Sequence, residues 1–201
     1  MNDIYSAKNE LRPAFLAKRA SLDEKYRQDA EHQAIQNLIS TEEFSSADKL
    51  LLYYPIRSEA DPLPLIEIAR GLGKRVAFPI CNKDDLTMRF FEISSREDFS
   101  LGAYNIPEPK EDLGELICDE RTLCIVPALL YSKDGHRLGW GKGYYDRFLA
   151  DFDGISVGFT YDGFVADELP HDEHDQRLYM IITEKGVYRC ERKAESGNRI
   201  P

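Results

Sequence analysis

The stretch TLCIVPALLYSKDGHRLGWGKGYYDRFLADF, residues 122–152, decides the fold. It opens with a nearly apolar run of strand length, TLCIVPALLY, which is typical of a strand covered on both faces. It closes with YYDRFLADF, which predicts a short helix, and a glycine-rich segment connects the two. A buried strand that leads through a short loop into a helix is the building unit of α/β proteins.

The same alternation of strand and helix extends in both directions from this stretch. Further apolar runs predict strands at KLLLYYP (49–55), KRVAFPI (74–80), LTMRFFEI (86–93, more exposed), ISVGFTY (155–161) and, before a turn at Lys185-Gly186, LYMIIT (178–183). Strands that alternate with helices and are covered on both faces form a mostly parallel sheet. The sequence therefore predicts an α/β fold, with ligands bound beyond the carboxyl ends of the strands.

Two helices are expected before the first strand. SAKNELRPAFLAKRA (6–20) has helical spacing of apolar residues, but Pro13 must either start that helix or kink it. Ser21 followed by Glu24 is a capping-box pattern, which predicts the start of the second helix.

Composition limits what this chain of 201 residues can be. We expect one domain over residues 1–190 and a polar tail over 191–201. The net charge of −10 argues against binding nucleic acid, although it leaves room for an anionic small molecule at a local cationic patch. Nothing in the sequence demands an oligomer, so a monomer is expected.

Cellular location is predicted from what the chain lacks. The apolar runs are too short to span a membrane, and the amino terminus has no apolar core of a secretory signal. The four cysteines form no CxxC pair, which argues against zinc or a redox dithiol. The simplest location is the cytoplasm, with the cysteines as core residues.

The glycine run matches neither standard phosphate loop. A P-loop needs GK[ST] and a dinucleotide loop needs glycine at the position that Tyr144 occupies. The pattern R-x-G-x-G-x-G-x-x-D still suits an anion, because glycines let amides turn toward it while Arg137 and Lys142 add positive charge. The alternative is a tight strand-to-helix connection with solvated charges. Trp140 and the two tyrosines favour a phosphate site walled by aromatic side chains.

Two acidic features are open to more than one interpretation. DGFVADELPHDEHD (162–175) holds six carboxylates and two histidines, a pattern that is commonly a solvated surface. It could instead hold a transition metal at His171, His174 and Asp175, although the spacing is not standard, or supply one carboxylate to a magnesium ion. Glu59 either favours the dipole of the next helix or hydrogen-bonds a heterocycle that carries N–H groups.

Five motifs in this order resemble the 5-formyltetrahydrofolate cyclo-ligase family. They are AKNELR, YYPIRSEADP, YNIPEP, VPALLYSKDGHRLGWGKGYYDRFL and LPHDEHD, and the resemblance runs from about residue 7 to 190. It implies a three-layer α/β sandwich similar to the sugar-phosphate isomerase and CoA-transferase-like fold. It also implies ATP- and magnesium-dependent conversion of 5-formyltetrahydrofolate to 5,10-methenyltetrahydrofolate, with release of ADP and phosphate.

The resemblance also implies which residues form the site. It suggests that ATP contacts Lys8, Asn9, Glu10, Leu11, Arg12, Arg137, Leu138, Gly139, Trp140, Gly141, Lys142, Gly143, Tyr144 and Tyr145. The folate side would comprise Tyr54, Glu59, Trp140, Gly141, Lys142, Gly143 and Tyr144. Asp146 and Asp175 would hold Mg²⁺. Residues 94–119 are irregular and are a hypothetical lid over the folate.

The expected chemistry is phosphoryl transfer to the formyl oxygen, attack by N10 on the formyl carbon and departure of phosphate. Such transfer depends on positioning and charge neutralisation, so no serine, cysteine or histidine nucleophile is expected. Arg137 and Lys142 would stabilise the phosphate. Two rivals stay open. A sugar-phosphate isomerase would need a carboxylate base and no ATP, and a nucleotide sensor would bind ATP without turnover.

Overall fold

A seven-stranded sheet forms the centre of the molecule in the computed structural model, which describes residues 2–110 and 112–190. Its strand order is β12-β11-β9-β6-β1-β2-β3. The five inner strands are parallel and the two edge strands are antiparallel. The strands are β1 (Lys49–Leu51), β2 (Arg75–Cys81), β3 (Met88–Glu92), β6 (Thr122–Val126), β9 (Ile155–Phe159), β11 (Met180–Thr183) and β12 (Gly186–Arg189).

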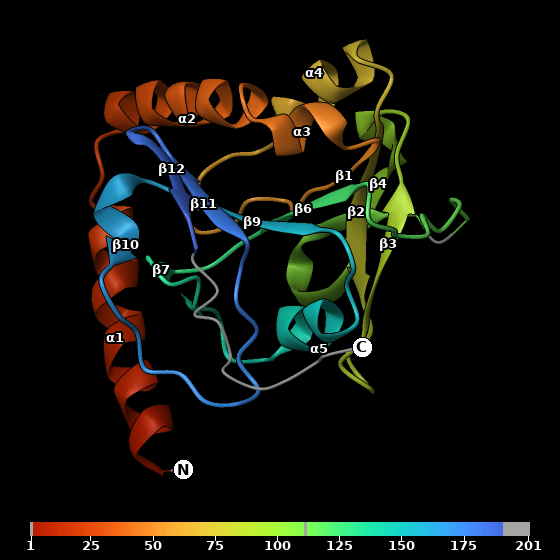
Figure 1. The fold of residues 1–201 in the computed structure, drawn as a ribbon. Coiled ribbons are helices and arrows are strands. Elements are labelled where there is room, and N and C mark those ends of the chain that lie inside the picture. Colours follow the sequence, from red (N-terminus) through yellow and green to blue (C-terminus); the bar gives the residue numbers. More distant parts are fainter. Residues whose placement is uncertain (1, 111, 191–201) are drawn as a thin grey trace, which may run out of the picture.

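Helices cover both faces of this sheet, which confirms the predicted three-layer α/β architecture. Alternating strand residues face opposite sides, so Leu50 packs with one apolar cluster and Leu51 with the other. Figure 1 shows α2 (Glu24–Ile39), α3 (Glu42–Ser46) and α4 (Leu65–Gly71) along one face and α5 (Tyr144–Ala150) against the other. The likeness to the isomerase and CoA-transferase-like fold stays a prediction.

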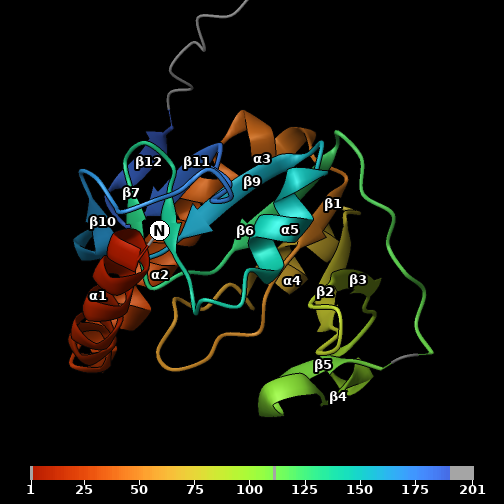
Figure 2. The ribbon, with the colours of Figure 1, turned by 90° about the horizontal axis from the view of Figure 1, so that it is seen from below.

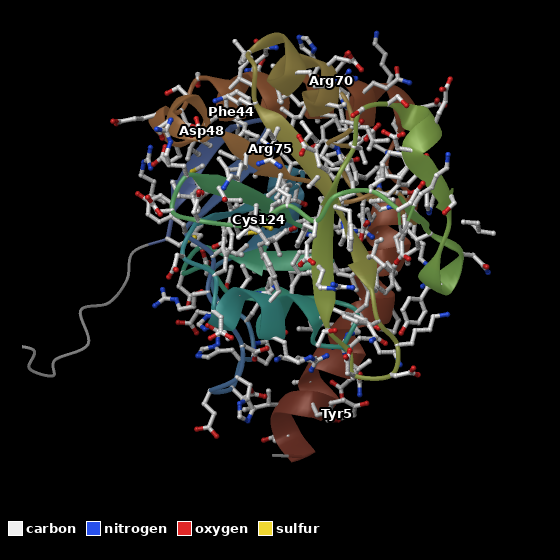
Figure 3. The ribbon with its side chains drawn as sticks, turned by 90° about the vertical axis from the view of Figure 1, so that its right-hand side faces the viewer. Tyr5, Phe44, Asp48, Arg70, Arg75 and Cys124 are labelled. Carbon is white, nitrogen blue, oxygen red and sulfur yellow. The ribbon has the colours of Figure 1, made fainter. Side chains whose placement is uncertain are left out.

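The interior between the layers is apolar, and the cysteine at its centre is a core residue as expected. Cys124 lies on β6 in the middle of the molecule (Figure 3) and is fully buried. Burial raises the pKa of its thiol well above the ordinary value. Because its interior is apolar and closely packed, the central sheet is a rigid platform for the loops at its edge.

The predicted strand over residues 122–131 is divided in two. β6 ends at Val126, and after Pro127 the chain enters a second, three-stranded sheet in the order β10-β7-β8. Proline has no N–H to donate to a ladder, which explains the break. The strands of this sheet are β7 (Leu130–Ser132), β8 (Arg137–Leu138) and β10 (Val165–Ala166).

The irregular region before β6 contains a small antiparallel pair, β4 (Phe99–Leu101) and β5 (Pro107–Pro109). Figure 2 shows this pair at the end of the molecule away from α1 (Asn2–Ala20). Three short 3₁₀ turns complete the fold, at Arg96–Asp98, Ala103–Asn105 and Asp162–Phe164. The strand predicted at residues 86–93, which corresponds to β3, was expected to be more exposed than the others. That expectation is wrong, because Met88, Phe90 and Phe91 are buried.

Of the two roles expected for Pro13, one is excluded, and the predicted start of the second helix needs correction. α1 runs through Pro13, so the proline does not start the helix. The capping box at Ser21 does not form. Asp23 is the N-cap of α2 and accepts a hydrogen bond from the Tyr26 amide, whereas the Ser21 hydroxyl donates to the Lys18 carbonyl. Aspartate and serine cap helices about equally well, so a competing cap nearby decides the start.

The strand order places the expected ligand site. From β1 the chain continues outward through β2 on one side, and later from β6 through β9 on the other. The order of strands therefore reverses between β1 and β6. In parallel sheets a crevice opens outside the carboxyl ends of the strands at such a point. The loop after β1 holds Glu59, and the chain after β6 leads to the glycine run.

The predicted single domain over residues 1–190 stays a prediction, and the predicted polar tail, 191–201, lies outside the described residues. In the described part of the chain, no helix combines the length and apolar character needed to cross a bilayer.

Candidate active site

One face of helix α1 presents three cations to the carboxyl edge of the sheet. Lys8, Arg12 and Arg19 share this face because their spacing follows the helical repeat. The Lys8 ammonium contacts Asp175, the Arg12 Nε donates to the carbonyl of Gly139 at 2.9 Å, and Arg19 bridges two loops. The helix thus ties together loops that lie far apart in the sequence.

Asp175 is the carboxylate at the outer end of this face. Its Oδ2 accepts hydrogen bonds from Lys8 Nζ at 2.5 Å and from the Asp172 amide at 2.7 Å. Burial alone would raise the pKa of the Asp175 carboxyl, but these bonds and the charge of Arg137 lower it below the ordinary value. Asp175 is therefore ionised at neutral pH.

Asp146, the second aspartate of the site, is held by the buried side chain of Arg137. Arg137 Nη2 donates to Asp146 Oδ1 at 2.7 Å, and Nη1 donates to the carbonyl of Gln176 at 2.6 Å. The Gln176 amide donates back to Asp146 Oδ1 at 3.2 Å. Arg137 is only 8% exposed, so this arrangement is fixed by the fold. It brings Asp146 next to the segment that carries Asp175, although the two are distant in sequence.

The donor set of these two aspartates fits a magnesium ion that also binds nucleotide phosphates. Mg²⁺ prefers oxygen ligands and is commonly held by one or two carboxylates plus phosphate. A transition-metal site at His171, His174 and Asp175 is wrong, since no three such ligands converge anywhere in residues 2–110 and 112–190. The His171 ring stacks on His136 with centroids 3.7 Å apart, and His174 is exposed.

Two glycines of the run have conformations that favour glycine. Gly141 has φ +87°, and an added Cβ would lie 3.1 Å from Arg12 Nη2. Gly143 has φ +70° and is the N-cap of α5, where a Cβ would lie 3.0 Å from Arg147 Nη1. Gly139 faces open space. The glycines therefore let the loop pass close to two guanidinium groups.

Trp140 connects the glycine run to the loop after β1. Its indole Nε1 donates to Glu59 Oε1 at 3.2 Å, and the Arg57 guanidinium stacks over its ring at 4.7 Å. Glu59 is 4% exposed, and its Oε2 accepts from the Ile56 amide at 3.0 Å. Burial raises the pKa of Glu59, and the charge of Arg19 opposes that rise. A buried carboxylate with few donors suits a ligand that brings N–H groups.

Tyr54 lines a separate hollow of about 300 Å³ on the same side. Its ring meets Phe99 of β4 edge-on at 5.7 Å, and Phe99 packs against Phe78 at 4.9 Å. The hollow is largely apolar, lined by Tyr54, Leu63, Ile66, Phe99, Ser100, Leu101 and Pro107. The small β4–β5 pair thus forms one wall of a pocket suited to a flat or apolar ligand.

The YNIPEP segment also reaches the glycine run. The hydroxyls of Tyr104 and Tyr144 are 3.0 Å apart, and the Tyr144 hydroxyl donates to the carbonyl of Asn82. Tyr145 turns inward, where its hydroxyl is buried without a hydrogen-bond partner among the described residues. The two adjacent tyrosines therefore face different surroundings.

Some predicted ATP-binding residues lie in the core, face solvent or bond only within their own helix. Leu11 and Leu138 pack with the hydrophobic core, and Glu10 is exposed. The Asn9 side chain accepts a bond from Arg12. Lys142 is exposed, and its ammonium group has no ion pair within the described residues. Roles in ATP binding for these residues stay predictions.

Sequence reasoning missed two arginines and one tyrosine of this site. Arg19 and Arg57 look like ordinary surface charges in the sequence, and Tyr104 lies in an irregular stretch. The helical spacing of Arg19 from Lys8 and Arg12 was the signal that could have identified it. Arg57 and Tyr104 lie inside the motifs YYPIRSEADP and YNIPEP, but no periodic pattern in these loops singles them out as site residues.

Comparison with known proteins gives the same family over most of the chain. The family model described as the 5-formyltetrahydrofolate cyclo-ligase family matches residues 4–184. The cyclo-ligase of Escherichia coli strain K12 is 26% identical over 176 residues, covering 85% of this chain and 97% of its own. That of Mycolicibacterium smegmatis is 28% identical over 190 residues, covering 89% and 94%.

Solved structures agree with this match. The solution structure of 5,10-methenyltetrahydrofolate synthetase from Aquifex aeolicus is 32% identical, has a TM-score of 0.80 and covers 96% of both chains. The Mycoplasma pneumoniae synthetase, 23% identical with a TM-score of 0.69, shares the fold over 88% of this chain. The chain belongs to the 5-formyltetrahydrofolate cyclo-ligase family.

Proposed function

We propose that this protein converts 5-formyltetrahydrofolate to 5,10-methenyltetrahydrofolate, with hydrolysis of ATP to ADP and phosphate. The observation that carries the proposal is the junction at Trp140. On one side the glycine run accepts a bond from Arg12 and lies in the chain between Arg137 and Asp146, and Asp146 bonds the amide next to Asp175. On the other it meets the buried carboxylate of Glu59. A phosphate-type site and a heterocycle-type site therefore adjoin within one loop.

The cations suit the ATP phosphates. Arg12, Arg137 and Lys8 come from two separate elements and surround the glycine run and its acidic neighbours. Exposed Lys142 adds a mobile charge from the loop itself. Phosphoryl transfer relies on positioning and on neutralising charge as it moves to the leaving oxygen, and such groups provide both.

Asp146 and Asp175 are the residues that would hold Mg²⁺. The bound ion would neutralise phosphate charge and so favour transfer. In the free protein these carboxylates are paired with Arg137 and Lys8, which keeps them ionised and in place. The same cations are then available to the phosphates when ATP brings the metal.

The folate would use the side of Glu59 and Tyr54. Glu59 offers carboxylate oxygens to the N–H groups of the pterin, in a buried setting where such bonds are strong. The hollow between Tyr54 and Phe99 offers an apolar wall to the rest of the ligand.

The reaction needs no covalent intermediate between substrate and enzyme. The formyl oxygen takes the γ-phosphoryl group, which converts a poor leaving group into phosphate and releases ADP. The N10 amine then attacks the formyl carbon, the C–O bond breaks, phosphate leaves with the oxygen, and N10 loses its proton. The chain's residues bind and orient the two substrates and exclude water, and no nucleophilic side chain is needed.

We also infer that the enzyme acts in the cytoplasm as a monomer, without nucleic acid or membrane partners. The net charge of −10 supports the absence of a nucleic-acid partner, since phosphates would be repelled.

The test is absorbance in the near ultraviolet, where the methenyl product absorbs and the formyl substrate does not. A rise is expected only when 5-formyltetrahydrofolate, ATP and Mg²⁺ are all present, and it should be lost in Asp146→Ala. ATP binding without a rise would favour a nucleotide sensor. Turnover of a sugar phosphate without ATP would favour an isomerase instead.

A further inference from the structure

Two buried side-chain polar atoms have no hydrogen-bond partner in the described part of the chain. They are Arg19 Nη2 and the Tyr145 hydroxyl. Buried donors are nearly always paired, so each unpaired one calls for a partner that binds there. Arg19 is the stronger case, because it is charged and only 2% exposed.

The rest of the Arg19 guanidinium is fixed. Its Nη1 donates to the carbonyl of Ala128 at 2.9 Å, in the chain after β6, and its Nε donates to the carbonyl of Arg57 at 3.3 Å, in the loop after β1. These two segments flank the point where the strand order reverses. Arg19 therefore cannot turn away to satisfy Nη2 elsewhere without breaking both bonds.

The free Nη2 lies next to the carboxylate of Glu59. It is 3.7 Å from Glu59 Oε1, which is close enough for an ion pair but too long for a hydrogen bond. The pair thus presents an unused N–H donor beside acceptor oxygens. Its complement is a ligand edge on which a carbonyl acceptor stands beside N–H donors.

The geometry points to Arg19 as a specificity-determining residue that reads the 4-oxo group of the pterin. In this arrangement Glu59 accepts from the pterin N3–H and 2-amino group, and Arg19 Nη2 donates to O4. The inference rests on the proposed function and adds to it the residue that selects a 2-amino-4-oxo ring.

Trp140 is bound to one member of this pair in the free protein. Its indole N–H donates to Glu59 Oε1, so the ring must shift before a pterin N–H can take its place at that oxygen. Gly141, with φ +87°, follows Trp140 in the chain and gives the loop the backbone freedom to move.

A purely structural arginine makes a different prediction. If Arg19 only neutralises Glu59 and joins two loops, its loss weakens every ligand by a similar factor. If it reads O4, its loss weakens a 4-oxo ligand and spares the 4-amino analogue, in which an amino group replaces O4 and N3 carries no hydrogen. The change at N3 affects Glu59 in the wild type and in the variant alike, so the difference between the two proteins reports the contact of Arg19. The ratio of the two affinities separates the roles, because any unfolded fraction of the sample cancels.

The experiment measures dissociation constants by calorimetry for 5-formyltetrahydrofolate and its 4-amino-4-deoxy analogue, without ATP. The wild type should prefer the 4-oxo ligand, and in Arg19→Met that preference should fall about 10- to 100-fold, the size of a hydrogen bond to a charged group. Arg19→Lys, which keeps a donor and the charge, should retain part of it.

An unchanged ratio in Arg19→Met, with both ligands weakened alike, would overturn the inference. Should Arg19→Met fail to fold, Arg19→Lys decides by the same ratio: a preference equal to that of the wild type, although the donor has moved, would also overturn it. A wild type that binds neither ligand would instead refute the proposed function. The two failures are distinguishable. Failure of this inference is seen only in the Arg19 variants, whereas failure of the proposed function is seen already in the wild type.

Discussion

Glu59 shows at the scale of one residue how burial and charge set a binding group. It lies at 4% exposure with Trp140, Ile56 and Arg19 around its two oxygens. Burial raises its pKa above the ordinary 4.5, so it takes up a proton at a higher pH than an exposed glutamate. Protonated Glu59 loses an acceptor for the substrate's N–H groups.

We therefore expect kcat/KM for 5-formyltetrahydrofolate to fall on the acid side at a pH above that of an ordinary glutamate. The free energy of unfolding should depend on pH in the opposite sense. Because burial favours the neutral form of Glu59, its contribution to stability is complete below the pKa of the unfolded state and is lost as pH rises through the higher pKa of the folded state.

Glu59→Gln should lack the acid limb of the kcat/KM profile and raise KM for the folate about tenfold or more, as expected for loss of a charged hydrogen bond. A Glu59→Gln enzyme with the wild-type pH profile would exclude this role.

Gly141 gives a second prediction at this scale. Gly141→Ala forces a side chain into φ +87° and places its Cβ 3.1 Å from Arg12 Nη2. The left-handed conformation costs a residue with a Cβ roughly 1–2 kcal/mol, and the guanidinium must also shift. KM for ATP should rise about tenfold, and the matched variant Gly139→Ala, which meets open space, should have a clearly smaller effect. Equal effects in steady-state kinetics would contradict this account of the loop.

Individual site residues were predictable only where a sequence pattern marks them. The glycine run and Glu59 follow predicted strands, where parallel sheets place their ligands, and Asp146 lies in the first turn of the helix predicted after the glycine run. Arg19 is marked only by its helical spacing from Lys8 and Arg12, and its partners could not be predicted because they are backbone carbonyls of two distant loops.

At the scale of elements, helix α1 and the segment of residues 167–178 together build the part of the site that surrounds the two aspartates, Asp146 and Asp175. Lys8 of the helix pairs with Asp175, and Arg137 of β8 holds both Asp146 and the carbonyl of Gln176. The position of Asp175 thus depends on two cations from different elements. Its charge is maintained by the same contacts that hold its segment.

Asp175→Asn should raise the Mg²⁺ concentration for half-maximal activity about tenfold, because one of two carboxylates is lost. KM for the folate should stay close to that of the wild type. Asp167→Asn is the matched control, since Asp167 begins the same segment but is 86% exposed and pairs with Lys133. Titration of Mg²⁺ in the absorbance assay measures both, and an equal shift in the two variants would assign the effect to general surface charge.

The types of the elements were predictable, but their limits were not. Apolar runs identified the strands of the sheet, yet β6 stops before Pro127 and β1 covers only Lys49–Leu51. After β1 the apolar run continues in the loop that leads to the site, where Leu52 and Tyr53 are buried and Tyr54 is half-buried. An apolar run indicates burial and not the type of element, so a buried loop gives the same sequence pattern as a strand.

At the scale of the whole molecule, two apolar clusters on opposite faces of one sheet hold the site loops at a common edge. Parallel pairing of β1 with both β2 and β6 fixes the crevice between their ends. The fold class was predictable because every inner strand is apolar on both faces. The order of strands was not, since periodicity does not reveal which strands are neighbours.

Leu50 lies at the centre of this platform and is fully buried. Leu50→Ala should lower the free energy of unfolding by about 2–5 kcal/mol, through lost burial and a remaining cavity. KM for both substrates should be little changed at low temperature, because Leu50 is a core residue and takes no part in the polar contacts of the site. Urea unfolding gives the first quantity and steady-state assays give the second. A large change in KM without loss of stability would show that the sheet does more than support the loops.

The central claim is that the formyl oxygen leaves as phosphate. The most direct measurement uses 5-formyltetrahydrofolate labelled with ¹⁸O in the formyl group, mixed with the protein, ATP and Mg²⁺. Formation of the methenyl product is followed by absorbance, and the released phosphate is analysed by mass spectrometry. The account predicts that each methenyl group formed transfers its ¹⁸O to phosphate. Methenyl product accompanied by unlabelled phosphate would contradict it.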